Sequence, residues 1–76
     1  MLHHKMTAQI IIDQIDRMDW IVSVHRINGT VEMHAVKITN PDDFHVARCN
    51  DGEGDDYDYR CACLLAEAVG IELEDG

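Results

Sequence analysis

The dipeptide Asn28-Gly29 constrains the fold of this chain more than any other short segment. A two-residue type I′ turn needs positive φ at both central positions, and Asn followed by Gly is the pair that adopts it most readily. Residues 20–27 and 30–38 flank this dipeptide and are rich in β-branched and large apolar residues, which favour strands. The sequence therefore predicts a β-hairpin centred on the Asn-Gly turn.

The turn also determines which residues lie opposite each other in the hairpin. The predicted pairs are Ile27 with Thr30, Val24 with Met33, Val22 with Ala35 and Trp20 with Lys37. One face is then apolar and is the expected core face: Trp20, Val22, Val24, Val31, Met33 and Ala35. The other face is mixed: Ile21, Ser23, His25, Glu32, His34, Val36 and Ile38.

A helix is expected on each side of the strands. Residues 7–18 have the apolar spacing of a helix capped by Thr7, with a core stripe of Ala8, Ile11, Ile12, Ile15 and Met18. A second helix is predicted over about residues 56–69, capped by Asp55 or Asp56 and stopped by Gly70. Its expected core stripe is Tyr57, Cys61, Leu64, Leu65 and Ala68, and Ile71 and Leu73 are expected to fold back onto the core.

A third strand is predicted after the hairpin. Residues 40–43, Asn-Pro-Asp-Asp, are typical of a turn, and residues 44–49 follow as the strand. Phe44 and Val46 are expected on the core face, which leaves His45, Ala47 and Cys49 on the mixed face. The predicted fold class is α+β with the order α-β-β-β-α: a three-stranded antiparallel sheet with both helices packed on one face. Residues 1–76 would form a single small domain in which residues 1–5 are flexible.

This order is similar to the topology of double-stranded-RNA-binding domains. The resemblance implies basic residues at the start of the last helix, where that family contacts its duplex. Here that position carries Asp55, Asp56 and Asp58, so the sign of the charge is reversed and the RNA-binding function is not expected. Residues 46–49, 59–67 and 70–76 also resemble segments of small uncharacterised acidic proteins of phage or bacterial origin, which have no activity to transfer.

The net charge of −9 arises entirely in the second half of the chain. Residues 1–41 carry four acids and four bases, whereas residues 42–76 carry eleven acids and two bases. Acids repel phosphate and anionic lipid, so direct contact with nucleic acid or membrane is not expected. The expected partner is a basic protein. Five acids lie in residues 51–58, more than the one or two that a helix cap needs, and they are the predicted binding site: Asp51, Glu53, Asp55, Asp56 and Asp58. An alternative is a nucleic-acid mimic that inhibits a DNA- or RNA-handling protein.

The same acidic segment lacks the pattern of an EF-hand calcium loop. Counted from Asp51, the sixth position holds Asp56 instead of Gly and the twelfth holds Ala62 instead of Glu. No metal or cofactor is therefore assigned to it. A second alternative function is metal binding by the mixed sheet face, because the expected register gathers zinc-type ligands there: His25, His34, Glu32, His45 and Cys49.

The sequence favours a non-catalytic cytoplasmic protein. Ser23 is the only serine and lies mid-strand, not on an exposed nucleophile turn. The three cysteines form an odd set, typical of reduced thiols, and no apolar run approaches the ~20 residues of a membrane span. Because both helices are needed on the other face, the mixed face is expected to be uncovered. It is the predicted association face, with homodimerisation as one outcome: Ile21, His25, His34, Val36 and Ile38.

Overall fold

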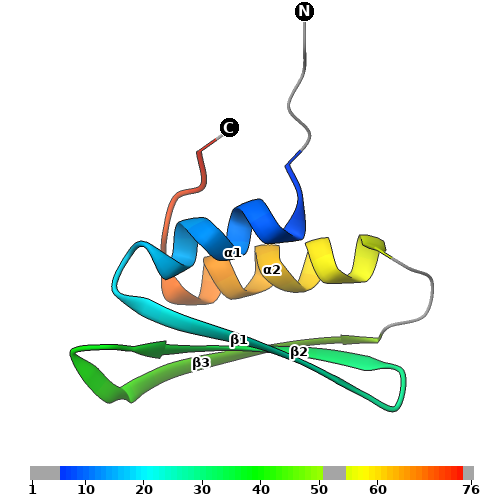
Figure 1. Ribbon diagram of the computed structural model, residues 1–76, viewed down its shortest axis with the longest axis horizontal. Helices are drawn as coiled ribbons and strands as arrows, with labels where there is room; N and C mark the ends of the chain where they lie inside the picture. Colours follow the sequence, from blue (N-terminus) through cyan, green and yellow to red (C-terminus); the bar gives the residue numbers. More distant parts are fainter. Residues whose placement is uncertain (1–5, 51–54, 75–76) are drawn as a thin grey trace, which may run out of the picture.

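The computed structural model describes residues 6–50 and 55–74, with side chains from residue 57 onward in the second segment. Its elements are α1 (Ala8–Asp16), β1 (Trp20–Ile27), β2 (Thr30–Lys37), β3 (Asn40–Asn50) and α2 (Asp55–Val69). The strands form one antiparallel sheet in the order β1-β2-β3, and both helices lie on the same side of it (Figure 1). The predicted α+β fold with the order α-β-β-β-α is confirmed. The expected flexible residues 1–5 and the expected caps Asp55 and Asp56 fall outside the described residues or side chains.

Helix α1 begins as the sequence predicts. The Thr7 hydroxyl accepts a hydrogen bond from the Ile10 backbone N–H at 3.2 Å, which satisfies a free donor of the first turn. Ile11 and Ile15, one turn apart, are both 0% exposed and anchor the helix in the core. The helix therefore depends on packing of a narrow apolar stripe more than on the propensity of its β-branched residues.

The end of α1 differs from the prediction, because the helix stops at Asp16 and does not reach Met18. The Met18 backbone N–H bonds to Ile15 O, which tightens the last turn, and Asp19 then adopts a positive φ of 73°. This sharp reversal leads straight into β1 and leaves the Met18 side chain 58% exposed. The expectation that Met18 joins the core is wrong.

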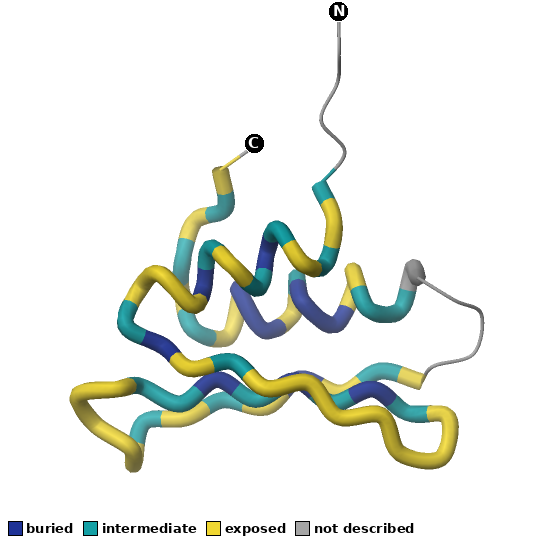
Figure 2. Tube along the Cα trace, viewed as in Figure 1, coloured by how far each residue is buried: buried dark blue, intermediate teal, exposed yellow. Residues whose placement is uncertain are grey.

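The hairpin of β1 and β2 has the predicted register throughout, from Ile27 opposite Thr30 to Trp20 opposite Lys37. Asn28 and Gly29 have φ values of 48° and 77°, as a type I′ turn requires. All but one of the predicted core-face residues are buried or half-buried (Figure 2). The exception is Val24, which lies on β1 at the edge of the sheet and is 43% exposed.

The connection from β2 to β3 is shorter than predicted. The chain turns at residues 38–39, so residues 40–43 do not form the turn but belong to the beginning of β3. Asp19 holds this turn, because its backbone oxygen accepts from the Ile38 N–H at 2.9 Å and its carboxylate accepts from the Thr39 hydroxyl at 3.0 Å. The left-handed corner after α1 thus also fixes the turn between β2 and β3.

A bulge in β3 then changes which of its residues face the helices. Lys37 lies opposite Asn40, but the preceding residue Val36 lies opposite Phe44, so residues 41–43 are inserted on the β3 side. Opposite residues in an antiparallel pair point to the same face. Phe44 therefore shares the face of Val36, which is the side of the sheet away from the helices.

The expected placement of β3 side chains is accordingly wrong. Phe44 is 60% exposed and Val46 is 43% exposed, whereas Ala47 is buried at 6% and pairs with core residue Met33. His45 and Cys49 share the helix side with Ala47 because each lies two residues away from it along the strand. Small residues on this side suit a strand that lies directly beneath α2.

Helix α2 packs on β3 and β2 and also against α1. Its buried residues are Cys61, Ala62, Leu65 and Ala66, so its core stripe is displaced from the predicted one. Leu64 is 43% exposed and Ala68 is also exposed, which contradicts their expected burial. Because α2 contacts both the sheet and α1, it buries two adjacent rows of side chains. The alanines in these rows permit the helix to approach its neighbours closely.

The C-terminal segment closes the core as expected. Gly70 has a φ of 80°, and its N–H bonds to Glu67 O while the Ile71 N–H bonds to Ala66 O, which is a Schellman motif. Ile71 and Leu73 then pack against the core cluster. Neither helix of the described segments has the length and apolar character needed to cross a membrane.

Candidate functional site

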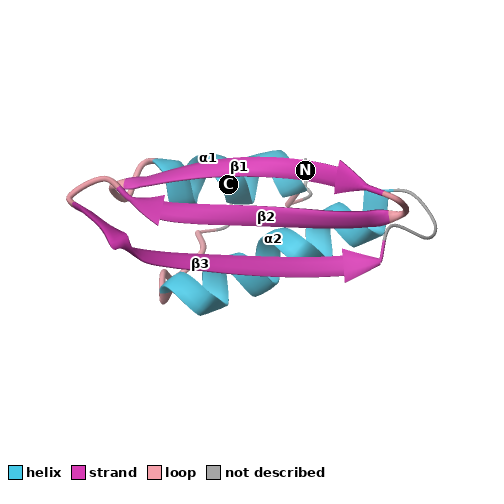
Figure 3. Cartoon of the chain, turned by 90° about the horizontal axis from the view of Figure 1, so that it is seen from below, coloured by secondary structure: helices cyan, strands magenta, loops and turns pink. Residues whose placement is uncertain are grey.

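The face of the sheet opposite the helices is uncovered in the described part of the chain (Figure 3). We call it the open face. The register aligns its side chains in three rows across β1, β2 and β3. The rows are Ile21–Val36–Phe44, Ser23–His34–Val46 and His25–Glu32–Arg48.

One end of the open face is apolar. Ile21 is 57% exposed and Phe44 is 60% exposed, with half-buried Val36 between them and Val46 in the next row. Sequence reasoning placed Ile21 and Val36 here but missed Phe44 and Val46. The signal that could have found them is the small size of Ala47 and Cys49. Small residues suit the side of β3 that lies beneath α2, so the residues that alternate with them face the other way. Such a cluster of exposed aliphatic and aromatic side chains is typical of an interaction surface.

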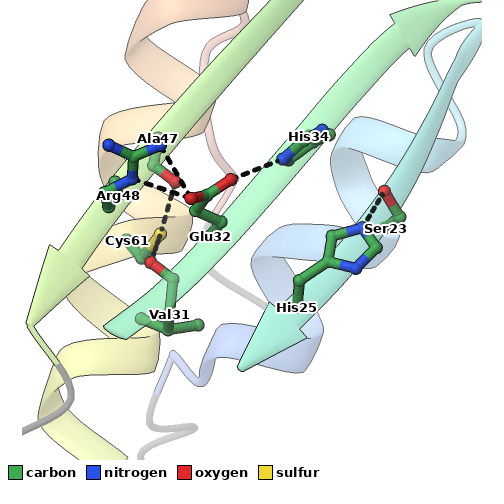
Figure 4. A network of polar contacts seen from close by, with 8 residues as sticks. All are labelled: Ser23, His25, Val31, Glu32, His34, Ala47, Arg48 and Cys61. Atoms are coloured by element: carbon green, nitrogen blue, oxygen red, sulfur yellow. Dashed lines mark hydrogen bonds and ion pairs between the residues drawn. The ribbon is translucent and has the colours of Figure 1, made fainter. Parts of the chain in front are cut away.

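The other end is polar and internally bonded (Figure 4). Arg48 donates from Nε at 2.8 Å and from Nη2 at 2.7 Å to Glu32 Oε2, and His34 Nε2 donates to Glu32 Oε1 at 2.9 Å. The rings of His34 and His25 meet edge to face with centroids 5.0 Å apart, and His25 Nε2 lies 3.2 Å from Ser23 Oγ. Glu32 is therefore the central group of this network.

The hydrogen bond from His34 lowers the pKa of Glu32 below its ordinary value of 4.5, and the hydrogen bond and charge of Arg48 add to this effect. A lowered pKa in the folded state stabilises the fold above the unfolded pKa. That contribution is lost as the pH falls through the folded pKa. Because the Arg48 side chain is exposed, solvent screens its ion pair with Glu32. The effect of this pair on the free energy of unfolding is therefore modest.

We expect Glu32→Gln to show this pH dependence directly. The thermal midpoint of the native chain should exceed that of the variant most clearly above pH 4.5, and the two should converge as the pH falls below that value. Circular dichroism melting between about pH 3 and pH 7 measures the difference. Glu67→Gln, which changes an exposed glutamate on α2, is the control and should give a profile parallel to that of the native chain. Equal profiles for the native chain and Glu32→Gln would contradict the role of Glu32.

The predicted association face is largely brought together. Ile21, His25, His34 and Val36 all lie on the open face. The fifth member, Ile38, lies in the turn between β2 and β3 and is 55% exposed.

The metal-binding hypothesis loses two of its ligands. His45 lies on the helix side, where its ring is 5.6 Å from that of Trp20, and Cys49 lies on the same side. The grouping of His45 and Cys49 with His25 and His34 is therefore wrong, because the bulge in β3 reverses their face. Among the side chains described, those of residues 6–50 and 57–74, no three of His, Cys, Asp or Glu are arranged to hold a metal ion.

Cys61 is a core residue, as predicted. Its side chain is 0% exposed and its thiol donates to Ala47 O at 3.3 Å. Burial raises the pKa of Cys61 to about 11, and the neighbouring Cys49 thiol adds to this. A thiol with so high a pKa holds its proton at neutral pH, which agrees with the place of Cys61 in the packed core.

The elements β3 and α2 carry a larger excess of acids than α1 and β1. Helix α1 packs on β1, whereas α2 packs on β3 and β2. Residues 8–27 carry three acids and two bases, but residues 40–50 and 55–69 carry six acids and two bases. We call β3 and α2 together the acidic α2/β3 side. Asp58 of α2 reaches Arg26 of β1, and the acidic C-terminal segment lies against α1, where Gln14 bonds to the Glu74 backbone.

Among the five predicted binding acids, Asp58 is the one whose side chain is described. It forms an ion pair with Arg26 of β1, and its side chain is 20% exposed. Asp58 therefore has a partner within the chain. Asp51 and Glu53 lie outside the described residues, as do the side chains of Asp55 and Asp56.

No family model matches this chain, and no curated protein or solved structure matches it either. The similarity to double-stranded-RNA-binding domains and to phage or bacterial proteins stays a prediction from the sequence. The function is therefore argued from the residues and their arrangement.

Proposed function

We propose that this chain is a non-catalytic cytoplasmic interaction domain that binds a basic protein through its acidic α2/β3 side. The observation that supports this proposal most is the coincidence of charge and position. The whole net charge of −9 arises in residues 42–76, which provide most of β3, the acidic segment, α2 and the C-terminal segment. A field of one sign on one side of a small domain attracts and orients a partner of opposite sign.

The individual acids support the same partner. Asp58 is already paired with Arg26, so its charge is used within the fold. Asp51, Glu53, Asp55 and Asp56 are further acids close by in the sequence, more than one helix N-terminus needs. Their excess attracts lysine and arginine side chains and repels phosphate.

Binding should depend on salt and on where the acids lie. The probe is a fluorescently labelled lysine-rich peptide, with binding followed by anisotropy at about 0.05 M and about 0.5 M NaCl. We expect several-fold weaker binding at the higher salt concentration, because exposed charges are then screened over a few ångströms. Equal affinity at both salt concentrations would exclude an electrostatic site.

A matched pair of variants tests the location. Asp51→Asn with Glu53→Gln removes two charges from the acidic segment, and Asp13→Asn with Asp16→Asn removes two from α1. The first variant should lose several-fold in affinity and the second should lose much less. Equal losses would show that overall charge, not the acidic side, determines binding.

A further inference from the structure

The two edges of the sheet differ in how they are protected. The strand order makes β1 and β3 the edges. β3 begins with Pro41, Asp42 and Asp43 inside a bulge, and these are features that prevent pairing with another chain. β1 has the sequence Trp-Ile-Val-Ser-Val-His-Arg-Ile, without proline, acid or register shift. The β1 edge is therefore suited to accept another strand.

The backbone of β1 has hydrogen-bonding groups directed outward. In a two-residue type I′ hairpin the residues that flank the turn, here Ile27 and Thr30, form a hydrogen-bonded pair, and such pairs alternate along an antiparallel ladder. Ile27 thus directs its backbone groups toward β2, while Val22 and Val24 direct theirs toward the free edge. A strand placed beside β1 would meet these donors and acceptors.

The apolar side chains of β1 are self-complementary about one point. Ile21, Val24 and Ile27 are 57%, 43% and 59% exposed, and Val24 lies midway between the two isoleucines. Two antiparallel copies related by a two-fold axis at Val24 would place Ile21 of each copy opposite the partner's Ile27. Each Val24 would then lie opposite the partner's Val24. All three exposed apolar residues of β1 find an apolar counterpart in this single register.

Charge favours the same edge. Residues 20–31 contain no acid, although the chain carries fifteen. Asp58 of α2 pairs with Arg26 of β1, so the described acid that reaches this edge is neutralised within its own chain. The N-terminal helix leaves room as well, because α1 has only nine residues and Val24 on its side of the sheet stays partly exposed.

We propose that two copies of this chain pair antiparallel through β1, with a two-fold axis at Val24, to form a continuous six-stranded sheet with four helices on one side. The occupant of the edge is a second copy, because the apolar pattern of β1 matches its own reverse. This proposal goes beyond binding of a basic partner and does not depend on it.

Sedimentation velocity of the full chain tests the assembly. An edge contact is small for an interface, so dimers should appear as the concentration rises through about 10–500 µM. The expected species has twice the chain mass of 8.6 kDa. Val24→Lys should remain monomeric, because two lysines would meet at the axis. Val46→Lys on the open face of β3 is the matched control, since Val46 is also 43% exposed, and it should still dimerise.

Circular dichroism confirms that both variants are folded before they are compared. A native chain that is monomeric throughout the range would overturn the proposal. So would loss of the dimer in Val46→Lys with retention in Val24→Lys, which would indicate stacking of two open faces.

Cysteine crosslinking tests the register. Opposite residues of a hydrogen-bonded pair have Cα atoms about 5.5 Å apart, which a disulfide can span. Val24→Cys should therefore crosslink to the partner's residue under mild oxidation, at a level above that of the native chain. Val22→Cys should not, because each position 22 would be four residues out of register with the other. Preferential crosslinking through position 22 would overturn the Val24 axis.

Discussion

Replacing Leu65 with alanine is expected to lower the free energy of unfolding by about 2–5 kcal/mol. Leu65 is 0% exposed on α2, where it belongs to the cluster that joins both helices to the sheet. The variant loses the transfer free energy of the side chain and leaves a cavity between packed elements. A domain of 76 residues has a total stability of roughly 4–11 kcal/mol, so much of it would be lost. Urea unfolding followed by circular dichroism measures the change.

The adjacent residue provides the control. Leu64 is 43% exposed, and we expect Leu64→Ala to cost less than about 1 kcal/mol. Both variants replace leucine with alanine, at adjacent positions of one helix, so the change in helix propensity is the same in both. Similar losses for both would mean that α2 is rotated relative to the arrangement described above.

The hairpin was predictable because its determinants are local. Asn28-Gly29 selects one turn type, and that turn fixes the register of both strands without reference to the rest of the chain. The cap of α1 by Thr7 and the stop of α2 at Gly70 are predictable for the same reason. Each depends on a few adjacent residues whose backbone conformations their side chains determine.

The face of β3 was not predictable by the same means. A shift of one residue in register moves every side chain of a strand to the other face. The turn at residues 38–39 is held by Asp19, which lies far away in the sequence, and the bulge at residues 41–43 follows this turn. Hydrophobicity alone favoured burial of Phe44. The register of β3 on β2 instead buries Ala47 on the helix side and leaves Phe44 exposed on the open face.

The candidate surfaces follow the same division. The open-face residues of β1 and β2 were predicted, because they come from the hairpin, and those of β3 were missed. The metal-binding hypothesis required His45 and Cys49 on that face, so it inherited the error in β3. The acidic segment was evident from composition, but the ion pair of Asp58 with Arg26 depends on how α2 packs across the sheet.

The two proposed interactions use different groups, because the β1 edge offers backbone groups and apolar side chains whereas the partner site offers acids. If two copies pair through β1, the assembly carries one acidic α2/β3 side from each copy. A basic partner would then meet two acidic sites on one assembly, and binding at both would strengthen attachment to a partner with two basic segments. The open faces of the two copies would also become continuous.

Ala35→Leu is expected to destabilise the fold by about 1–3 kcal/mol and to shift the emission of Trp20 to longer wavelength. Ala35 is 0% exposed and lies between Val22 of β1 and His45 of β3 on the helix side. The Trp20 and His45 rings approach each other across β2 to 5.6 Å, and a small side chain on the intervening strand leaves space for them. A leucine there would push the rings apart and expose Trp20, which is 6% exposed and the only tryptophan. Val36→Leu, on the open face one residue away, should leave both the stability and the emission nearly unchanged. Unaltered emission in a folded Ala35→Leu variant would contradict the close packing of this end of the core.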